Sequence, residues 1–302
     1  MKIRKINRKG IVNITFLSPL LQIAKTPEEL FIKGTLLSDR PPVVAIVGTR
    51  RPSAYGREVT QTLAGDLARK GVVVVSGLAM GVDTIAHTSA LEAGGKTIAV
   101  LAQGLHTIYP ASNKGLAERI VKNGALITEY DTGAEAMKHH FLARNRLVSG
   151  LADAVIVTEA ADKSGTFSTV AHALEQNKEV FAVPGPITSL LSAGPNRLIQ
   201  QGARVALSAD DILQVIAPHL IAGQTKFVFG NTPLETKIIE LIQGGVRNGE
   251  ELQKQAGVSS SEFLQALTMM ELNGTIRPLG GNGTYTFPTR KHGQTDPIRP
   301  II

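Results

Sequence analysis

A short stretch of the sequence combines positive charge with an aromatic ring. It reads Lys138, His139, His140, Phe141, Leu142, Ala143, Arg144, Asn145 and Arg146. Lysine and arginine hold phosphates and an aromatic ring stacks on a base, which are the two requirements of single-strand binding. The alternative is that Phe141 is a core residue of an amphipathic helix. The adjacent histidines do not predict a metal site, because no third His, Asp or Glu lies at ligand spacing.

Two adjacent arginines, Arg50 and Arg51, follow an apolar run that leads into Gly48 and Thr49. A guanidinium group is a planar fork of N–H donors that matches the oxygens of a phosphate. We therefore expect at least one of these arginines to contact phosphate. The alternative is that one of them pairs with a carboxylate of the fold.

Two loops of small residues each open a helical pattern. They contain Ser76, Gly77 and Gly81 in the first loop, and Ser164, Gly165 and Thr166 in the second. Backbone N–H groups at a helix N-terminus face an anion readily, although a single capping Ser or Thr is the simpler alternative. The two glycines of the first loop are four residues apart, which does not match the G-x-G-x-x-G pattern of dinucleotide sites. We expect a shared anion site without a nicotinamide or other cofactor.

The elements that position these residues follow from the hydrophobic pattern. From residue 43 onward, short runs rich in valine and isoleucine alternate with longer helical patterns, which is typical of βαβ units. The expected strands are Val43–Val47, Val72–Ser76, Thr97–Leu101, Ala125–Thr128, Ala154–Val157 and Val180–Val183. The expected helices are Tyr55–Lys70, Val82–Ala93, Lys114–Lys122, Phe141–Leu151 and Thr166–Gln176. The pattern predicts an α/β fold with a doubly wound, mostly parallel sheet and a ligand crevice at the carboxyl ends of its strands.

A second, smaller domain follows a connector rich in Gly, Gln, Thr and Pro. Its expected elements are helices Leu234–Ile242, Gly249–Ala256 and Ser261–Leu272 and strands Thr275–Arg277 and Thr284–Phe287. Three helices and a hairpin indicate a winged helix-turn-helix. We divide the chain into a basic arm and lead-in (1–41), a sheet domain (42–218), a linker (219–232), a winged-helix-like domain (233–288) and a flexible tail (289–302).

Composition excludes several classes of protein. The 302-residue chain contains no Cys, so disulfides, thiolate metal sites and a cysteine nucleophile are excluded, and a reducing cytoplasm fits. No run of eighteen apolar residues predicts a membrane-spanning helix. The net charge is +7, but residues 1–40 alone contribute +5, with eight Lys or Arg against three Asp or Glu. A solvated terminus explains this basic arm, and contact of the arm with phosphates is the alternative.

The blocks quoted so far occur in the order of one known family. They read GTRRPSAYG, VVSGLAMGVDTIAH, GGKTIAVLAQGLHTIYP, FLARNRLVSGL, EAADKSGTFSTVAHALE and VFAVPGPI. From about Pro42 to Leu213 the sequence resembles the DNA-processing protein A family (DprA, also called Smf), many members of which also carry a winged helix. The resemblance implies an extended Rossmann fold that binds single-stranded DNA, forms a homodimer and loads the RecA recombinase during natural transformation, without catalysis.

The resemblance also implies which residues form the DNA pocket. These are Arg50 or Arg51, Ser76, Gly77, Gly81, Lys138, Phe141, Arg144, Asn145 and Arg146, with Ser164, Gly165 and Thr166 closing the pocket. Many members carry a helical, SAM-like domain before the Rossmann domain, and residues 1–41 are too few to hold one.

An alternative is an enzyme, because the fold is also similar to that of the LOG-like nucleoside-monophosphate phosphoribohydrolases. Their P-G-G-x-G-T-x-x-E loop supplies a carboxylate for glycosidic cleavage. Aligning G-T-x-x-E on Gly165 and Thr166 places Thr169 at the position of the glutamate. The sequence therefore lacks the main catalytic group of that family.

A further alternative is that the winged helix reads duplex DNA. Its candidate recognition helix, Ser259–Asn273, contains Glu262 and Glu271 but no Lys or Arg. A helix in the major groove normally brings basic residues to phosphates and guanine edges. We expect this domain to bind another protein, or to contact DNA only weakly through Arg277, Arg290 and Lys291.

Overall fold

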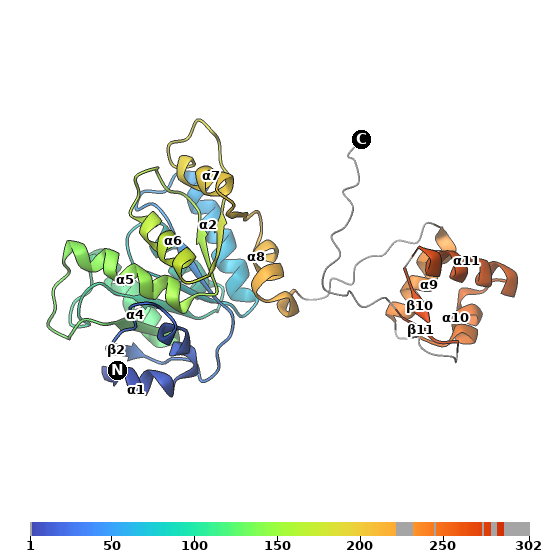
Figure 1. Cartoon of the computed structure of the whole chain (residues 1–302), viewed down its shortest axis with the longest axis horizontal. Coiled ribbons are helices and arrows are strands. Elements are labelled where there is room, and N and C mark those ends of the chain that lie inside the picture. Colours follow the sequence, from blue (N-terminus) through green and yellow to red (C-terminus); the bar gives the residue numbers. More distant parts are fainter. Residues whose placement is uncertain (1, 222–231, 245, 274, 279–282, 287–302) are drawn as a thin grey trace. The chain divides into compact units, whose positions relative to one another are not determined.

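The structure is a computed structural model that describes residues 2–221, 232–244, 246–273, 275–278 and 283–286 (Figure 1). The chain divides into two compact units, residues 1–221 and 222–302, and each is described by itself. Most of the expected linker and the whole expected tail, 289–302, lie outside the described residues. No helix in the described part of the chain is long and apolar enough to cross a membrane.

The first unit is built on one large sheet. Its strands are β1 (Arg4–Asn7), β2 (Glu29–Gly34), β3 (Val43–Val47), β4 (Val73–Ser76), β5 (Thr97–Val100), β6 (Ala125–Thr128), β7 (Ala154–Val157), β8 (Glu179–Ala182) and β9 (Arg204–Val205). They lie in the order β1-β2-β6-β5-β4-β3-β7-β8-β9. The seven strands from β6 to β9 are parallel, whereas β1 and β2 pair in antiparallel fashion beside β6. The predicted mostly parallel α/β fold is confirmed.

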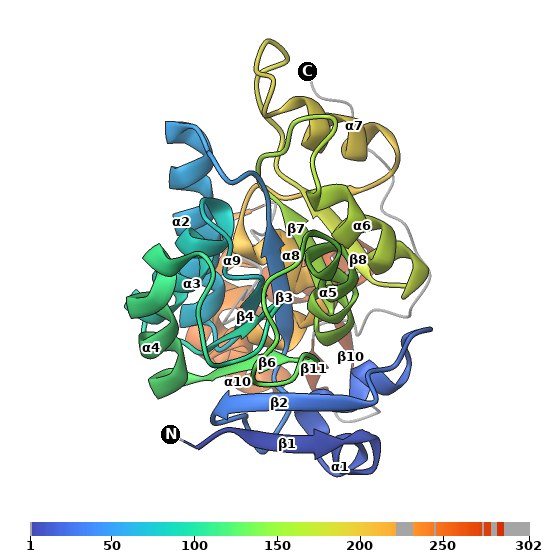
Figure 2. The ribbon, with the colours of Figure 1, turned by 90° about the vertical axis from the view of Figure 1, so that its left-hand side faces the viewer.

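Helices cover both faces of this sheet, because its strand residues are apolar on both sides (Figure 2). In β3, Val43, Ala45 and Val47 belong to one hydrophobic core, whereas Val44 and Ile46 belong to the other. The first core includes residues of α1 (Arg8–Val12), η1 (Thr15–Leu21), α5 (Lys138–Leu151), α6 (Thr166–Glu175) and α7 (Ala193–Gln200). The opposite face packs against α2 (Ala54–Arg69), α3 (Val82–Glu92), α4 (Lys114–Asn123) and α8 (Ala209–Ile216).

The N-terminal segment is not the arm expected from its charge. Residues 4–34 contain β1 and β2, which extend the sheet, and the intervening η1 buries Phe16 and Leu20. In β2, Leu30 and Ile32 face one core and Phe31 faces the other, so this strand is held by burial on both sides. The positive charges remain at the surface of folded structure because their long side chains reach solvent.

The order of the strands determines where the pocket forms. Strand β3 has β4 on one side and β7 on the other, so the chain builds the sheet in both directions from β3. The loops that follow β3, β4 and β7 diverge at this point and leave a crevice at the carboxyl ends of the strands. The sequence pattern predicted a ligand crevice at this edge of the sheet.

The second unit has its own small core. Its elements are α9 (Pro233–Gln243), α10 (Gly249–Ala256), α11 (Ser260–Leu272), β10 (Arg277–Pro278) and β11 (Tyr285–Thr286). Strands β10 and β11 pair in antiparallel fashion, and Ile239, Leu252 and Phe263 are among the core residues. Ser259 caps α11 and Glu262 bonds back to it, as a capping box does. The expected hairpin turn falls largely on residues 279–282, outside the described residues.

Candidate nucleic-acid interface

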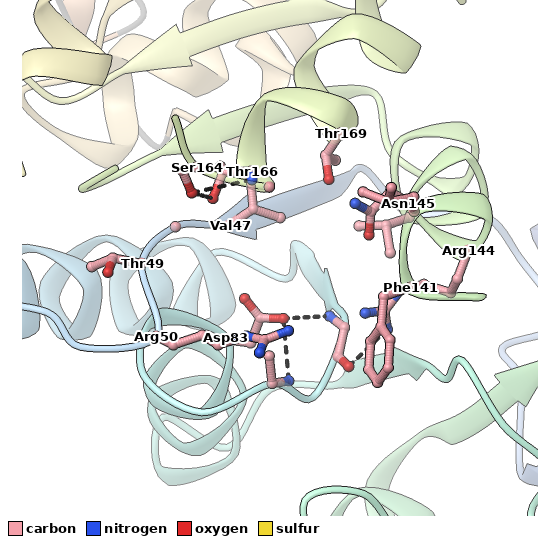
Figure 3. Close-up of a pocket in the computed structure, with 16 residues that line it drawn as sticks. Val47, Thr49, Arg50, Asp83, Phe141, Arg144, Asn145, Ser164, Thr166 and Thr169 are labelled. Carbon is pink, nitrogen blue, oxygen red and sulfur yellow. Dashed lines mark hydrogen bonds between the residues drawn. The ribbon is translucent and has the colours of Figure 1, made fainter. Parts of the chain in front are cut away.

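A pocket of about 350 Å³ lies at the carboxyl edge of the sheet (Figure 3). It is formed by the end of β3, the loops after β4 and β7, the first turns of α3 and α6, and the first three turns of α5. Its lining is Val47, Gly48, Thr49, Arg50, Gly77, Ala79, Asp83, Phe141, Leu142, Arg144, Asn145, Val148, Ser164, Gly165, Thr166 and Thr169. Eight of the thirteen residues predicted for the DNA site are therefore brought together here.

The two adjacent arginines differ in position. Arg50 lines this pocket and two hollows next to it, whereas Arg51 lines none of the three. The guanidinium carbon of Arg50 lies 5.8 Å from the centre of the Phe141 ring, on which it stacks as a cation. Arg50 is exposed and forms no ion pair with any described residue. Arg50 is thus the arginine that is free to meet a phosphate.

Phe141 forms the aromatic floor between the pocket and its neighbour. The ring is half-buried on the first turn of α5, and Tyr109 meets it edge to face with 5.7 Å between ring centres. On its outer side, a wider hollow of about 780 Å³ is lined by Arg50, Tyr109, Phe141 and Lys138, among others. Lys138 is the first residue of α5 and is exposed. A flat ring flanked by two cations can hold a base with its phosphates.

The loop after β4 uses its own amides inside the fold. The carboxylate of Asp83 accepts the N–H groups of Gly77 (3.0 Å) and Ala79 (3.3 Å). Ser76 is fully buried and donates its hydroxyl to the carbonyl oxygen of Ile46 at 2.7 Å. Gly81 has φ +79° and lies against the backbone of Arg50, where a side chain has no room. Ser76 and Gly81 therefore shape the loop from outside the pocket, and the expected amide cradle is occupied by Asp83.

Arg144 is buried, and its guanidinium group binds backbone carbonyl oxygens of the fold. Its Nη1 donates to the carbonyl oxygen of Gly77 at 2.7 Å and also to that of Val100. Burial lowers the pKa of the Arg144 guanidinium to about 10, while the nearby Asp83 carboxylate raises it and Arg50 lowers it. Arg144 therefore stays charged at neutral pH and adds positive potential beneath the pocket.

Two other predicted residues on α5 are committed to internal partners. Arg146 forms a two-pronged ion pair with Glu129, with distances of 3.1 and 2.6 Å, and does not line the pocket. The sequence allowed Arg50 or Arg51 to pair with a carboxylate of the fold. In the structure it is Arg146 that forms such a pair. Asn145 lines the pocket, but its Nδ2 donates to the Ser168 hydroxyl at 2.9 Å.

The loop after β7 closes the pocket at the N-terminus of α6. The hydroxyl oxygens of Ser164 and Thr166 lie 2.9 Å apart, and the Thr166 N–H donates to Ser164 at 3.2 Å. An added Cβ at Gly165 would meet nothing within 4 Å, so the backbone there is open to a ligand. The helix dipole makes this end favourable for an anion.

Sequence reasoning missed several lining residues. Thr49 and Asp83 gave no separate signal, although both lie within the quoted blocks. Tyr109 lines the neighbouring hollow and lies in the loop after the third expected strand, which the strand pattern places at this edge of the sheet. Thr169 lines the pocket where the hydrolase family has its glutamate. Among the described residues of this lining, the only carboxylate is Asp83, and burial raises its pKa.

Comparison with known proteins addresses both units. The sequence model of the family DNA recombination-mediator protein A matches residues 12–217, and that of the DprA winged helix domain matches residues 229–282. A DNA processing protein DprA from Bacillus subtilis is 45% identical over 197 residues, which are 65% of this chain and 66% of that protein. A DprA of Mycobacterium tuberculosis is 38% identical over 246 residues, which are 62% of its length, so the chain spans less than two thirds of these relatives.

Two solved structures are also similar. DNA processing protein A from Streptococcus pneumoniae gives a TM-score of 0.65 at 38% identity, covering 72% of this chain and 75% of that one. The DNA processing protein A from Helicobacter pylori, solved for its single-stranded DNA binding mode, gives 0.62 at 34% identity, covering 71% and 95%. Because the family's sequence model covers more than half of the chain and all of the sheet strands from β2 to β9, the chain belongs to the DNA recombination-mediator protein A family.

Proposed function

We propose that this protein binds single-stranded DNA at the pocket and on the adjoining Phe141 ring. The observation that carries the proposal is the grouping of Arg50, Lys138 and Phe141, since two exposed cations flank one aromatic ring at the carboxyl edge of the sheet. The cations hold successive phosphates while the ring supports a base, so binding tolerates any sequence. The relative from Helicobacter pylori, solved for its single-stranded DNA binding mode, supports this proposal.

We propose that binding is the activity and that no bond is made or broken. A glycosidic hydrolase needs a carboxylate at the sugar. The lining offers Asp83, whose carboxylate already accepts two backbone N–H groups, and it has Thr169 where the hydrolase motif has glutamate. This geometry disfavours the LOG-like alternative.

The cellular role that we propose comes from the family resemblance. The protein would protect incoming strands in the cytoplasm and load the RecA recombinase in natural transformation or recombination. It would act as a homodimer, whose two pockets gain affinity on long strands by avidity. The strand β9 supports the homodimer, since it is the last strand of the described sheet, and Val205 and the nearby Leu207 expose apolar surface at this edge.

The test of strand binding is fluorescence anisotropy with labelled oligothymidylate and with matched duplex, each at two salt concentrations. We expect the single strand to bind more tightly and its affinity to fall steeply with salt, because each neutralised phosphate releases counterions. Equal or tighter binding of the duplex would contradict the proposal. Absence of strand binding, together with release of free base from a nucleoside monophosphate, would favour the hydrolase.

A further inference from the structure

A second groove runs along helix α4, outside the site described above. Its volume is about 780 Å³, and it lies between α4, strands β2 and β6, and the loop that follows β5. The apolar floor includes Leu105, Ile108, Val121 and Leu126. The groove is on the sheet face that carries α4, because Leu105 and Leu126 belong to the core that also holds Phe31.

Three lysines border this groove. Lys33 comes from β2, and Lys114 and Lys122 come from the two ends of α4. None of the three forms an ion pair with another described residue. Glu118 is the one acidic residue among the lining side chains that the structure describes, so positive charge is in excess. Unpaired ammonium groups above an apolar floor suit a ligand with negative charges along an apolar body.

The groove adjoins the hollow beside the DNA site. His106, Thr107 and Ile108 line both this groove and the hollow that contains Lys138 and Phe141. These three residues lie in the loop after β5, and the first two are exposed. The loop therefore borders both cavities, and a strand that leaves the Phe141 ring past this loop comes next to the groove with the three lysines.

We propose that the lysine groove, formed by Lys33, Lys114 and Lys122 with the loop 105–108, holds the continuing phosphate backbone of the same single strand. This inference rests on the proposed function. Ammonium groups act as point charges on phosphates and read no sequence, so the groove lengthens the binding site without adding base preference. The affinity gained from the groove is available only to strands long enough to reach past Phe141.

The test compares a short oligothymidylate of about 5 nucleotides with a long one of about 16. The variant Lys33→Gln/Lys114→Gln/Lys122→Gln removes the groove charges and keeps polar side chains at its rim. For the long strand, the slope of log affinity against log salt should become shallower by about 0.7 for each lost phosphate contact, or about 2 for three. Binding of the short strand should stay as in the unmodified protein.

A matched control removes three charges elsewhere. Lys9, Lys25 and Lys96 are exposed and carry no ion pair in the described part of the chain. Lys9 lies on α1 and Lys25 follows η1, two elements that pack on the opposite sheet face, and Lys96 precedes β5 at its amino end. The variant Lys9→Gln/Lys25→Gln/Lys96→Gln should keep the slope for both strands.

Three outcomes would overturn the inference. The groove variant could keep the full slope on the long strand, it could lose the same slope on both strands, or the control variant could lose as much as the groove variant. If the unmodified protein binds the short strand and the groove variant is unchanged on the long one, the groove proposal fails and the proposed function stands. If the unmodified protein binds neither strand, both fail.

Discussion

Arg50 and Arg51 provide a matched pair for a test at single-residue scale. Both are exposed, but only Arg50 lines the pocket and approaches the Phe141 ring. Arg50→Ala should weaken single-strand binding by about 1.5–3 kcal/mol, roughly tenfold or more, because a charged hydrogen bond to phosphate is lost. Arg51→Ala should change affinity little. Anisotropy titrations over a salt series measure both affinity and the number of phosphate contacts.

The salt series also gives the result that would refute this assignment. Loss of one phosphate contact should reduce the salt slope by about 0.7 in Arg50→Ala, equally for strands of any sequence. If Arg51→Ala shows the larger loss, the phosphate lies on the other side of the loop and the geometry of the pocket has been misassigned.

The chemistry of the site could be predicted from sequence more completely than the role of each side chain. Phe141 and Lys138 lie on the first turn of α5 beside the pocket, as the motif indicated. Arg144 and Arg146 belong to the same motif, but their partners are Gly77 and Glu129, 67 and 17 residues away in the sequence. A local pattern identifies an arginine, and only the tertiary fold determines whether its charge faces a ligand or an internal acceptor.

At the scale of elements, the six strands from β3 to β8 were predicted from the sequence, whereas β1, β2 and β9 were not. The apolar run of β3 predicts a strand, and the strand has the expected bounds. In contrast, β1 has the sequence Arg-Lys-Ile-Asn and β9 has two residues, so neither shows a hydrophobic run. Edge strands such as these are held by backbone pairing and by their neighbours, which the pattern of one segment does not report.

His87 on α3 links elements through a buried hydrogen bond. The hydroxyl of Thr97 on β5 donates to the carbonyl oxygen of Val74 on β4, so the His87 Nδ1–H must donate to Thr97, at 2.6 Å. The Nε2 atom of His87 is buried without a partner among the described residues. Protonation would place a charge there with no acceptor. Burial, with Arg144 adding to it, lowers the pKa of His87 to about 3.

This buried histidine predicts how stability depends on pH. The unfolded chain binds a proton at His87 below about pH 6.5, whereas the folded protein does so only near pH 3, so acid favours unfolding. Between these values the free energy of unfolding should fall by about 1.4 kcal/mol per pH unit from this residue. Urea unfolding of the unmodified protein and of His87→Gln, from about pH 7 to about pH 5, measures the difference in slope.

The comparison between variants is needed because another group acts in the opposite direction. Burial raises the pKa of Asp83, so the folded state gains a proton there as pH falls and is stabilised by it. His106→Gln is the control, since His106 is exposed on the loop after β5 and should keep the slope of the unmodified protein. Equal slopes in the unmodified protein and His87→Gln would contradict the assignment of a neutral buried histidine.

At the scale of the whole molecule, the two units differ in the surfaces that they offer to a partner. The first unit carries the pocket cations and the lysine groove, while α11 of the second unit contains no Lys or Arg. The exposed side of α11 presents Leu264, Met269 and Leu272 instead. Apolar side chains at the position of a recognition helix suit a protein surface better than the phosphates of a duplex.

Binding by the separated units tests this division. Residues 1–221 alone should retain single-strand affinity close to that of the full chain under conditions where the oligomeric state is the same, because the pocket and the groove lie within that unit. Residues 230–302 should bind duplex DNA only weakly, since α11, the candidate recognition helix, contains no Lys or Arg. Anisotropy with labelled duplex and single strand measures both. Tight, salt-sensitive duplex binding by residues 230–302 would show that the second unit binds duplex DNA. That result would contradict the assignment of α11 to a protein partner.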